Sequence, residues 1–186
     1  MDRDLIDRAK RGDRDAFTAL VLQFGDRLYS VAYRILRDAS RAEDAVQQTF
    51  LTAWRELNRL RDDDRLEAWL YRLLVNACYA EARHTKRWQP GLRLITDAYF
   101  GPTTDDSHLT VELRDQLERA FRRLTLEQRA VLVFHHYLDL TMVEVADRLG
   151  IPVGTVKSRL HHATAALRAS VDADARTPTT TQERLA

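Results

Sequence analysis

The sequence has almost no cysteine: Cys78 is the one such residue among 186. A single cysteine excludes an intramolecular disulfide and any zinc site built on cysteine pairs. Long apolar runs are lacking as well, because the longest, residues 130–134, falls far short of the ~20 residues that a membrane-spanning helix needs. The first residues, Met-Asp-Arg-Asp, contain no apolar stretch of the secretion-signal type. We therefore expect a cytoplasmic protein with no direct membrane insertion.

Signs of catalysis are equally sparse. The chain has 6 glycines and none of them forms a glycine-rich loop of the phosphate-binding kind. His135, His136 and Asp139 are metal-ligand types, but adjacent side chains on a helix point about 100° apart and cannot share one ion without help from elsewhere. Cys78 is expected to be a small core residue rather than a nucleophile. We predict that the protein is not an enzyme and has no metal and no cofactor.

What the chain does contain is helical patterning. Hydrophobic residues make up 45% and charged residues 31%, which is typical of a soluble folded protein. Apolar residues recur at steps of three and four from Phe17 to Ile35, which predicts one buried face of a long helix. Gly12 and Asp13 mark the boundary before this helix. No segment alternates apolar and polar residues long enough for a strand, so the predicted fold class is all-α.

Two more long helices are expected in the N-terminal part. Ser40 and Glu43 have the spacing of a capping box, which predicts the start of the second long helix. The acids at 62–64 interrupt that helix and cap a third one, whose apolar stripe runs from Leu66 onward. Together these helices predict an N-terminal bundle over residues 1–88.

The composition changes after this bundle. Residues 89–110 contain two prolines, two glycines and a polar run, which predicts a flexible linker with little regular structure. Helices resume at about Val111 and are expected to form a second domain over residues 111–171. Residues 172–186 include the run Thr-Pro-Thr-Thr-Thr and predict a disordered tail. The chain is therefore expected to hold two helical domains on a flexible linker.

The strongest local pattern lies between residues 141 and 167. Thr141 and Glu144 have capping-box spacing, and Gly150 can take the left-handed conformation that ends a short helix. A second helix follows after Pro152, with basic and hydroxyl residues on its outer face. This arrangement is the helix-turn-helix pattern and predicts DNA binding. An ordinary helical hairpin with a solvated basic face would have the same outline.

Charge is unevenly distributed, although the net charge is only +1. Residues 82–96 and 148–171 each carry four basic residues and no acid, and the acidic stretch 97–118 lies between them. Two basic zones separated by an acidic connector favour two contacts with a polyanion. Basic runs alone are more often plain solvated helix faces.

Three segments resemble one known family, in the order in which the family has them. Residues 144–160 (EVADRLGIPVGTVKSRL) resemble the promoter-reading domain of the extracytoplasmic-function (ECF) sigma factors, group IV of the major bacterial sigma family. Residues 42–50 (AEDAVQQTF) resemble the family's polymerase-docking helix, and residues 65–77 (RLEAWLYRLLVNA) its promoter-melting helix. The resemblance extends from Asp4 to about Ala169. A helix-turn-helix alone would be weak evidence, but three ordered motifs make the match specific.

The resemblance implies a sigma factor with three binding surfaces, one for polymerase and two for DNA. A stripe on the second long helix would dock on the clamp helices of core RNA polymerase: Asp44, Gln47, Gln48 and Leu51. The loop before the third long helix, and one face of that helix, would recognise and melt the minus-10 element of promoter DNA: Arg61, Asp62, Asp63, Arg72, Asn76, Tyr79 and Arg83. The C-terminal domain would read the minus-35 element: His135, Gly154, Thr155, Lys157, Ser158, Arg159, His161 and His162.

These roles suit the residue types. Asn76 can read a base edge, and arginines on the same face can hold the backbone of a separated strand. Three consecutive acids at 62–64 would repel phosphate, so we expect some of them to point away or to cap the helix. The family commonly has an acid where this chain has Gln48, and often an arginine in place of His162. A neutral histidine weakens the phosphate contact, so modest DNA affinity is expected without polymerase.

The resemblance also implies an anti-sigma factor as a partner, one that could hide both DNA-binding faces. Free of polymerase, the two domains are expected to pack loosely or against each other. The alternative is a stand-alone helix-turn-helix regulator that dimerises through its N-terminal bundle and binds a two-fold related DNA site without polymerase. That alternative leaves the stripe around Asp44 and the face around Asn76 unexplained.

Overall fold

The computed structural model describes residues 3–88 and 111–175, and all regular elements in these ranges are helices. The N-terminal helices are α1 (Arg3–Lys10), α2 (Arg14–Leu36), α3 (Ala39–Glu56) and α4 (Leu66–Trp88). The C-terminal helices are α5 (Val111–Arg123), α6 (Leu126–Leu132), α7 (Met142–Leu149) and α8 (Val153–Ala175). Two 3-10 turns, Leu57–Arg59 and Asp63–Arg65, connect α3 to α4, and a π-helix, Val133–Tyr137, continues α6. The predicted all-α fold class is confirmed, and within the described ranges no helix has the length and apolarity to cross a membrane.

Capping residues set most helix boundaries at the predicted positions. Gly12 has a φ of 88°, and the carboxylate of Asp13 then accepts two backbone N–H groups in the first turn of α2. Complete capping boxes form at Thr125, which starts α6, and at Thr141, which starts α7. Gly150 has a φ of 67° and ends α7. Short-range backbone chemistry therefore fixes where these helices begin and end.

The predicted start of α3 is wrong. Asp38 caps this helix in place of Ser40, because its carboxylate accepts the N–H of Arg41 at 3.0 Å. Arg37 has a φ of 58° and already turns the chain out of α2, so the next residue is the first with extended backbone. Ser40 therefore lies within the first turn of α3 and is exposed.

The predicted C-terminal tail also begins too early. Helix α8 continues to Ala175, past residue 172, because the chain has no glycine or proline there and alternates alanine with aspartate. The rest of the predicted tail, residues 176–186, and the predicted linker, residues 89–110, lie outside the described residues.

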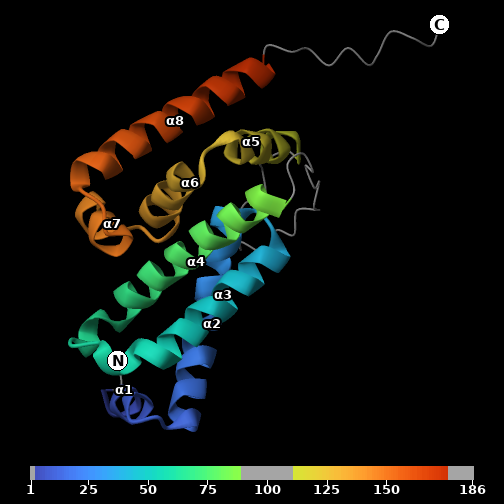
Figure 1. Ribbon diagram of the computed structural model, residues 1–186. Coiled ribbons are helices and arrows are strands. Elements are labelled where there is room, and N and C mark those ends of the chain that lie inside the picture. Colours follow the sequence, from blue (N-terminus) through green and yellow to red (C-terminus); the bar gives the residue numbers. More distant parts are fainter. Residues whose placement is uncertain (1–2, 89–110, 176–186) are drawn as a thin grey trace, which may run out of the picture.

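Residues 3–88 form the N-terminal unit. Helices α2, α3 and α4 pack side by side, and α1 lies against the start of α2 (Figure 1). Leu28, Leu57 and Leu74 are among the fully buried side chains of this unit. Cys78 is buried in the same core, and burial raises the pKa of its thiol to about 12. As predicted, it is a neutral core residue.

Residues 111–175 form the C-terminal unit. Helix α8 runs across α5 and α6, and α7 lies at its start (Figure 1). Leu124, Leu132 and Ala163 form a small buried cluster between these helices, with Phe121, Leu160 and Leu167 packed against it. This cluster packs α8, the second helix of the helix-turn-helix, against α5 and α6.

The core of the N-terminal unit continues into the C-terminal unit and joins the two. Phe134 of the π-helix is fully buried and meets Tyr71 of α4 edge to face, with 5.5 Å between ring centroids. Val145 of α7 and Val156 of α8 belong to the same cluster as the core of the N-terminal unit. Buried aromatic pairs are among the larger apolar contributions to packing. Of the two arrangements expected for the free chain, the structure has the one in which the units pack together.

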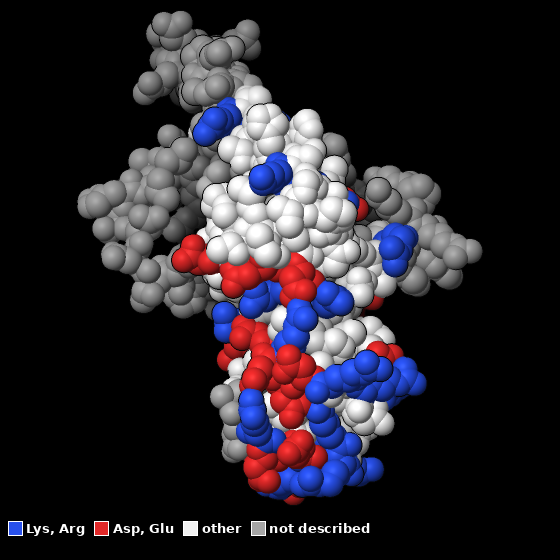
Figure 2. All heavy atoms as spheres, turned by 90° about the vertical axis from the view of Figure 1, so that its left-hand side faces the viewer, with Lys and Arg blue, Asp and Glu red and all other residues white. Residues whose placement is uncertain are grey.

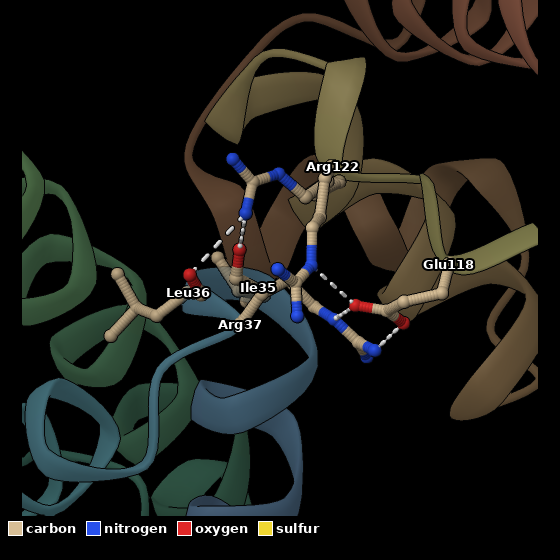
Figure 3. A network of polar contacts seen from close by, with 6 residues as sticks. Ile35, Leu36, Arg37, Glu118 and Arg122 are labelled. Atoms are coloured by element: carbon tan, nitrogen blue, oxygen red, sulfur yellow. Dashed lines mark hydrogen bonds and ion pairs between the residues drawn. The ribbon is translucent and has the colours of Figure 1, made fainter. Parts of the chain in front are cut away.

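An ion pair at the end of α2 also joins the units (Figure 3). Arg37 and Glu118 of α5 form a two-pronged pair in which Arg37 Nε donates to Glu118 Oε1 at 3.0 Å. Arg122 Nε donates to the same oxygen at 2.9 Å. The Arg37 and Glu118 side chains are 11% and 12% exposed, so solvent screens this pair weakly.

A second arginine reaches the same end of α2. Arg129 of α6 donates to the backbone oxygens of Ile35 at 2.7 Å and Leu36 at 3.4 Å. Figure 3 labels these two accepting residues. These carbonyls end a helix and carry its partial negative charge, which compensates the guanidinium. Burial, and the neighbouring Arg37 among other arginines, lower the pKa of Arg129 to about 10. It therefore stays charged at neutral pH while lying between the two units.

Replacing Gly150 with alanine should lower the free energy of unfolding by about 1 kcal/mol, because an L-residue at this positive φ is strained. The added Cβ would meet only Arg72 Nε at 3.9 Å, which is ordinary contact, so the cost comes from the backbone. Denaturant unfolding followed by circular dichroism measures the change.

The matched control is Gly25→Ala in α2, where the added Cβ finds nothing within 4 Å. This variant should be more stable by about 0.5–1 kcal/mol, because alanine favours a helix interior over glycine. Shifts of both variants in the same direction would contradict this explanation of the turn.

Candidate nucleic-acid interface

The first turns of α8 present an acid-free polar face. Val156 and Ala163 are buried on the inner side of the helix. The predicted minus-35 residues exposed on the outer side are Gly154, Lys157, Ser158, His161 and His162. Figure 2 shows isolated basic groups over this part of the molecule, and acidic side chains gathered where the two units meet. A helix with such a face after a tight turn has the geometry that enters a major groove.

Two other predicted minus-35 residues, Thr155 and Arg159, are half-buried. Arg159 lies close enough to Tyr79 of α4, a residue predicted to bind the minus-10 element, to lower the pKa of its hydroxyl. Burial raises the pKa of Tyr79 to about 12, so its hydroxyl is neutral. The structure therefore brings together two residues that the sequence assigns to separate promoter elements.

His135 lies in the π-helix before α7. Its Nδ1 is 2.7 Å from the backbone oxygen of Leu140, so Nδ1 carries the proton of this hydrogen bond. The ring is half-buried. This hydrogen bond fixes His135 against the turn into α7, and only Nε2 remains for the predicted phosphate contact.

The three acids before α4 have intramolecular partners. Asp62 accepts the N–H of Asp64 at 3.1 Å and caps the 3-10 turn. Asp63 forms an ion pair with Lys10 of α1, and Asp64 pairs with Arg3 at 2.8 Å. The expectation that some of these acids cap or point away is therefore confirmed. Asp63, predicted as a minus-10 residue, is 21% exposed and is held by Lys10.

A hollow of about 300 Å³ lies beside this loop. Its walls include Arg61 and Trp69 from the N-terminal unit and Asp147 from α7. Arg65 and Arg72 also line it. The hollow combines guanidinium groups with one aromatic ring, which are the groups that hold and stack single-stranded nucleic acid.

The minus-10 face continues along α4. Arg72, Asn76 and Arg83 are all exposed, at spacings of four and seven residues that place them on one side of the helix. Arg72 Nη2 donates to the backbone oxygen of Asp147 at 2.6 Å. These three side chains therefore share one exposed side of α4, and Arg72 also contacts α7.

The predicted polymerase-docking stripe lies on α3, away from the contact between the units. All four of its residues are exposed: Asp44, Gln47, Gln48 and Leu51. Beside it, α2 and α3 form a shallow apolar hollow lined by Phe17, Phe50 and Trp54. Trp54 is 39% exposed and stacks edge to face on Phe17 at 4.9 Å. Trp54 is not among the residues predicted for this surface, although it follows Leu51 by three residues on the same helix face.

Comparison with known proteins places both helical units in one family. The model of sigma-70 region 2 matches residues 20–88, and that of sigma-70 region 4 matches residues 114–167. Among curated relatives, SigM of Mycobacterium tuberculosis (strain H37Rv), an ECF RNA polymerase sigma factor, is 35% identical over 89% of this chain and 82% of its own length. SigW of Bacillus subtilis, another ECF sigma factor, is 29% identical over 90% of this chain and 95% of its own length.

Solved structures have the same fold. CnrH, solved in complex with the cytosolic domain of CnrY, aligns with a TM-score of 0.62 and 27% identity over 93% of this chain and 98% of that one. RpoE of Bartonella quintana, solved with the anti-sigma factor NepR, aligns with a TM-score of 0.68 and 24% identity, covering 85% and 98% of the two chains. With two sigma regions in family order, and a helix-turn-helix in the second, the chain belongs to the ECF RNA polymerase sigma factors, which are transcription initiation factors.

Proposed function

We propose that the exposed faces of α3, α4 and α8 carry out different steps of promoter-specific initiation in this sigma factor. Residues 1–88 would dock on core RNA polymerase and open the minus-10 element, and residues 111–171 would read the minus-35 element. Residues 89–110 would link the two functions. The observation that carries the proposal is that each matched family segment has a polar face of the required kind on its surface.

The docking face would consist of the α3 stripe and the apolar hollow beside it. Asp44 offers one charge for a basic partner, and Gln47 and Gln48 offer hydrogen bonds. Leu51 is 46% exposed and, with Trp54, gives the face an apolar centre. A polar rim around exposed aromatic and aliphatic side chains is the usual build of a protein–protein interface.

The promoter would be read at two places. Arg61, Arg72 and Arg83 would hold the backbone of the separated strand, and Asn76 would read a base edge. On α8, Lys157 and Arg159 would contact phosphate or guanine, with Ser158 beside them. We assign neither DNA role to Asp63, because its ion pair with Lys10 turns it to α1.

We also propose that the protein acts in the cytoplasm, as an initiation factor rather than an enzyme, and that an anti-sigma factor holds it. Two solved neighbours support this partner, because RpoE is described with an anti-sigma factor and CnrH with the cytosolic domain of CnrY. The stand-alone regulator is not favoured, because region 2 accounts for residues 20–88 and a simple regulator has no need of it.

Transcription with purified components distinguishes a sigma factor from a stand-alone regulator. Core RNA polymerase free of other sigma factors should start transcripts from cognate promoters only when this chain is added. Protection of a palindromic site by the chain alone, with no transcript from any candidate promoter, would favour the stand-alone regulator.

Replacing Asp44 and Gln47 together with alanine should weaken binding to core RNA polymerase by about tenfold, because both side chains belong to the docking stripe. Fluorescence titration of the full-length chain with core polymerase measures this affinity. Glu43→Ala is the matched control, since it removes an exposed charge from the neighbouring face of α3. Equal loss of DNA affinity in the double variant would argue against a dedicated docking face.

Lys157→Ala should weaken promoter binding by the polymerase complex on all sequences alike and reduce the slope of log affinity against log salt by about one, because one phosphate contact is lost. Arg168→Ala removes the same charge from an exposed site further along α8 and should change neither quantity. Filter binding across a salt series measures both. A similar loss in the two variants would mean that general charge, not the start of α8, carries the contact.

A further inference from the structure

We infer that α1 positions the loop between α3 and α4, with Lys10 as the positioning residue and Asp63 as its point of contact on the loop. The inference rests on the minus-10 role proposed for this loop. Helix α1 lies at the end of the N-terminal unit where α4 begins (Figure 1), and it precedes residues 20–88, the segment that matches sigma-70 region 2. Its effect on promoter recognition is exerted through the loop, without a DNA contact of its own.

The loop has two sides with different neighbours. Its ends are fixed, because Leu57 and Leu66 are buried in the core. Between these ends, Asp63 and Asp64 pair with side chains of α1. The other polar side chains of the loop line the hollow of about 300 Å³ beside it: Arg61, Asp62 and Arg65. The direction of the side chains in the hollow therefore depends on how firmly α1 holds the two acids.

The ion pair of Lys10 with Asp63 is the stronger of the two contacts with α1. Its side chains are 19% and 21% exposed, so solvent screens it weakly. The pair of Arg3 with Asp64 is 2.8 Å long, but its side chains are 71% and 67% exposed. Ion pairs as exposed as this one contribute little. Most of the hold on the loop is therefore expected from Lys10.

Helix α1 is itself firmly attached to α2. Ile6 and Ala9 are buried in the core of the N-terminal unit. At the end of α1, Arg8 Nε donates to one oxygen of the Asp13 carboxylate at 2.9 Å. The other oxygen of that carboxylate accepts the two backbone N–H groups that begin α2. Because α1 is attached through both its apolar face and its end, it can hold the loop in one place.

The hydrogen bonds within the loop fix its shape rather than its position. Asp62 accepts the N–H of Asp64 at 3.1 Å, which closes one turn. Lys10 reaches this turn from outside the loop. Arg65 at the end of the loop pairs with Asp147 of α7, but both side chains are about half exposed. Side chains that are already in place bind at a lower entropic cost, so a held loop should favour the DNA sequence that fits it.

Lys10→Met tests the hold, because methionine keeps the length of the side chain and removes its charge. The full-length chain with core RNA polymerase transcribes promoters randomised in the minus-10 element, and the transcripts are sequenced. The preference for the best minus-10 sequences over the next best should fall about threefold. Arg11→Met removes an exposed charge next to Lys10 and should leave the preference unchanged. An unchanged preference in Lys10→Met, or an equal fall in both variants, would overturn the inference.

Asp63→Asn distinguishes positioning from a direct contact of Lys10 with DNA. If Lys10 acts through the loop, Asp63→Asn lowers the preference as Lys10→Met does, and the double variant lowers it no further. Lys10→Arg keeps the ion pair and should retain the preference. If Lys10 binds phosphate instead, Asp63→Asn releases it, so promoter binding tightens and the minus-10 preference stays as it was. That outcome would exclude a positioning role.

Hydrogen exchange of the free chain measures the hold without polymerase or DNA. The amides of Leu60, Asp64 and Arg65 donate hydrogen bonds within the loop. Lys10→Met should speed exchange over residues 60–65 by about threefold or more and leave residues 125–149 unchanged. Faster exchange along the whole chain would mean that Lys10 stabilises the fold in general, and exchange unaltered in the loop would mean that it holds nothing. Either result contradicts the inference.

The transcription experiment also separates this inference from the proposed function. If the chain without substitutions gives no transcript from any member of the promoter library, the proposed function fails, and the inference fails with it. If the chain gives transcripts with a clear minus-10 preference that Lys10→Met leaves intact, the inference alone fails.

Discussion

The C-terminal end of α2 is the point on which the arrangement of this protein depends. Carbonyl groups there have no partner within their own helix, and Arg129 from α6 binds them. One residue further, Arg37 leaves the helix in a left-handed conformation and pairs with Glu118 of α5. Two helices of the C-terminal unit are thereby fixed to one helix terminus of the N-terminal unit. The position of α7 and α8 over α4 follows from that attachment, together with the buried contact between Tyr71 and Phe134.

The positive charge of the arginines on α4 and the loop before it underlies both the proposed DNA contact and their pairing within the chain. Arginines that bind phosphate must be accessible and must not be permanently neutralised, yet in a free chain they attract any acidic group within reach. Here Asp147, which belongs to the unit proposed to read the other promoter element, pairs with Arg65. In a protein with two DNA-binding units on one chain, an acidic side chain of one unit can therefore pair with basic side chains of the other.

Much of the fold could be predicted from the sequence because the relevant signals are local. The boundaries at Gly12, Thr125, Thr141 and Gly150 each depend on a few neighbouring residues. The start of α3 was missed because a tight turn at Arg37 made Asp38, not Ser40, the first residue able to cap. The exposed faces of α3, α4 and α8 also follow from helical spacing.

What could not be predicted involves residues far apart in the chain. The partners of Asp63, Asp147 and Tyr79 depend on how whole helices pack, and no spacing rule gives that. Trp54 was within reach of prediction, since it continues the face of Leu51, but an aromatic residue on an amphipathic helix usually belongs to the core.

Helix α1 precedes the segment that matches sigma-70 region 2, yet it contacts the loop that we propose binds the promoter. Lys10 and Arg3 pair with the acids at 63 and 64 and so offset two negative charges on this loop. The electrostatic character of the loop is consequently set by a short leading helix outside the shared module. Relatives with an identical loop but a different first helix would present a different field to the same DNA.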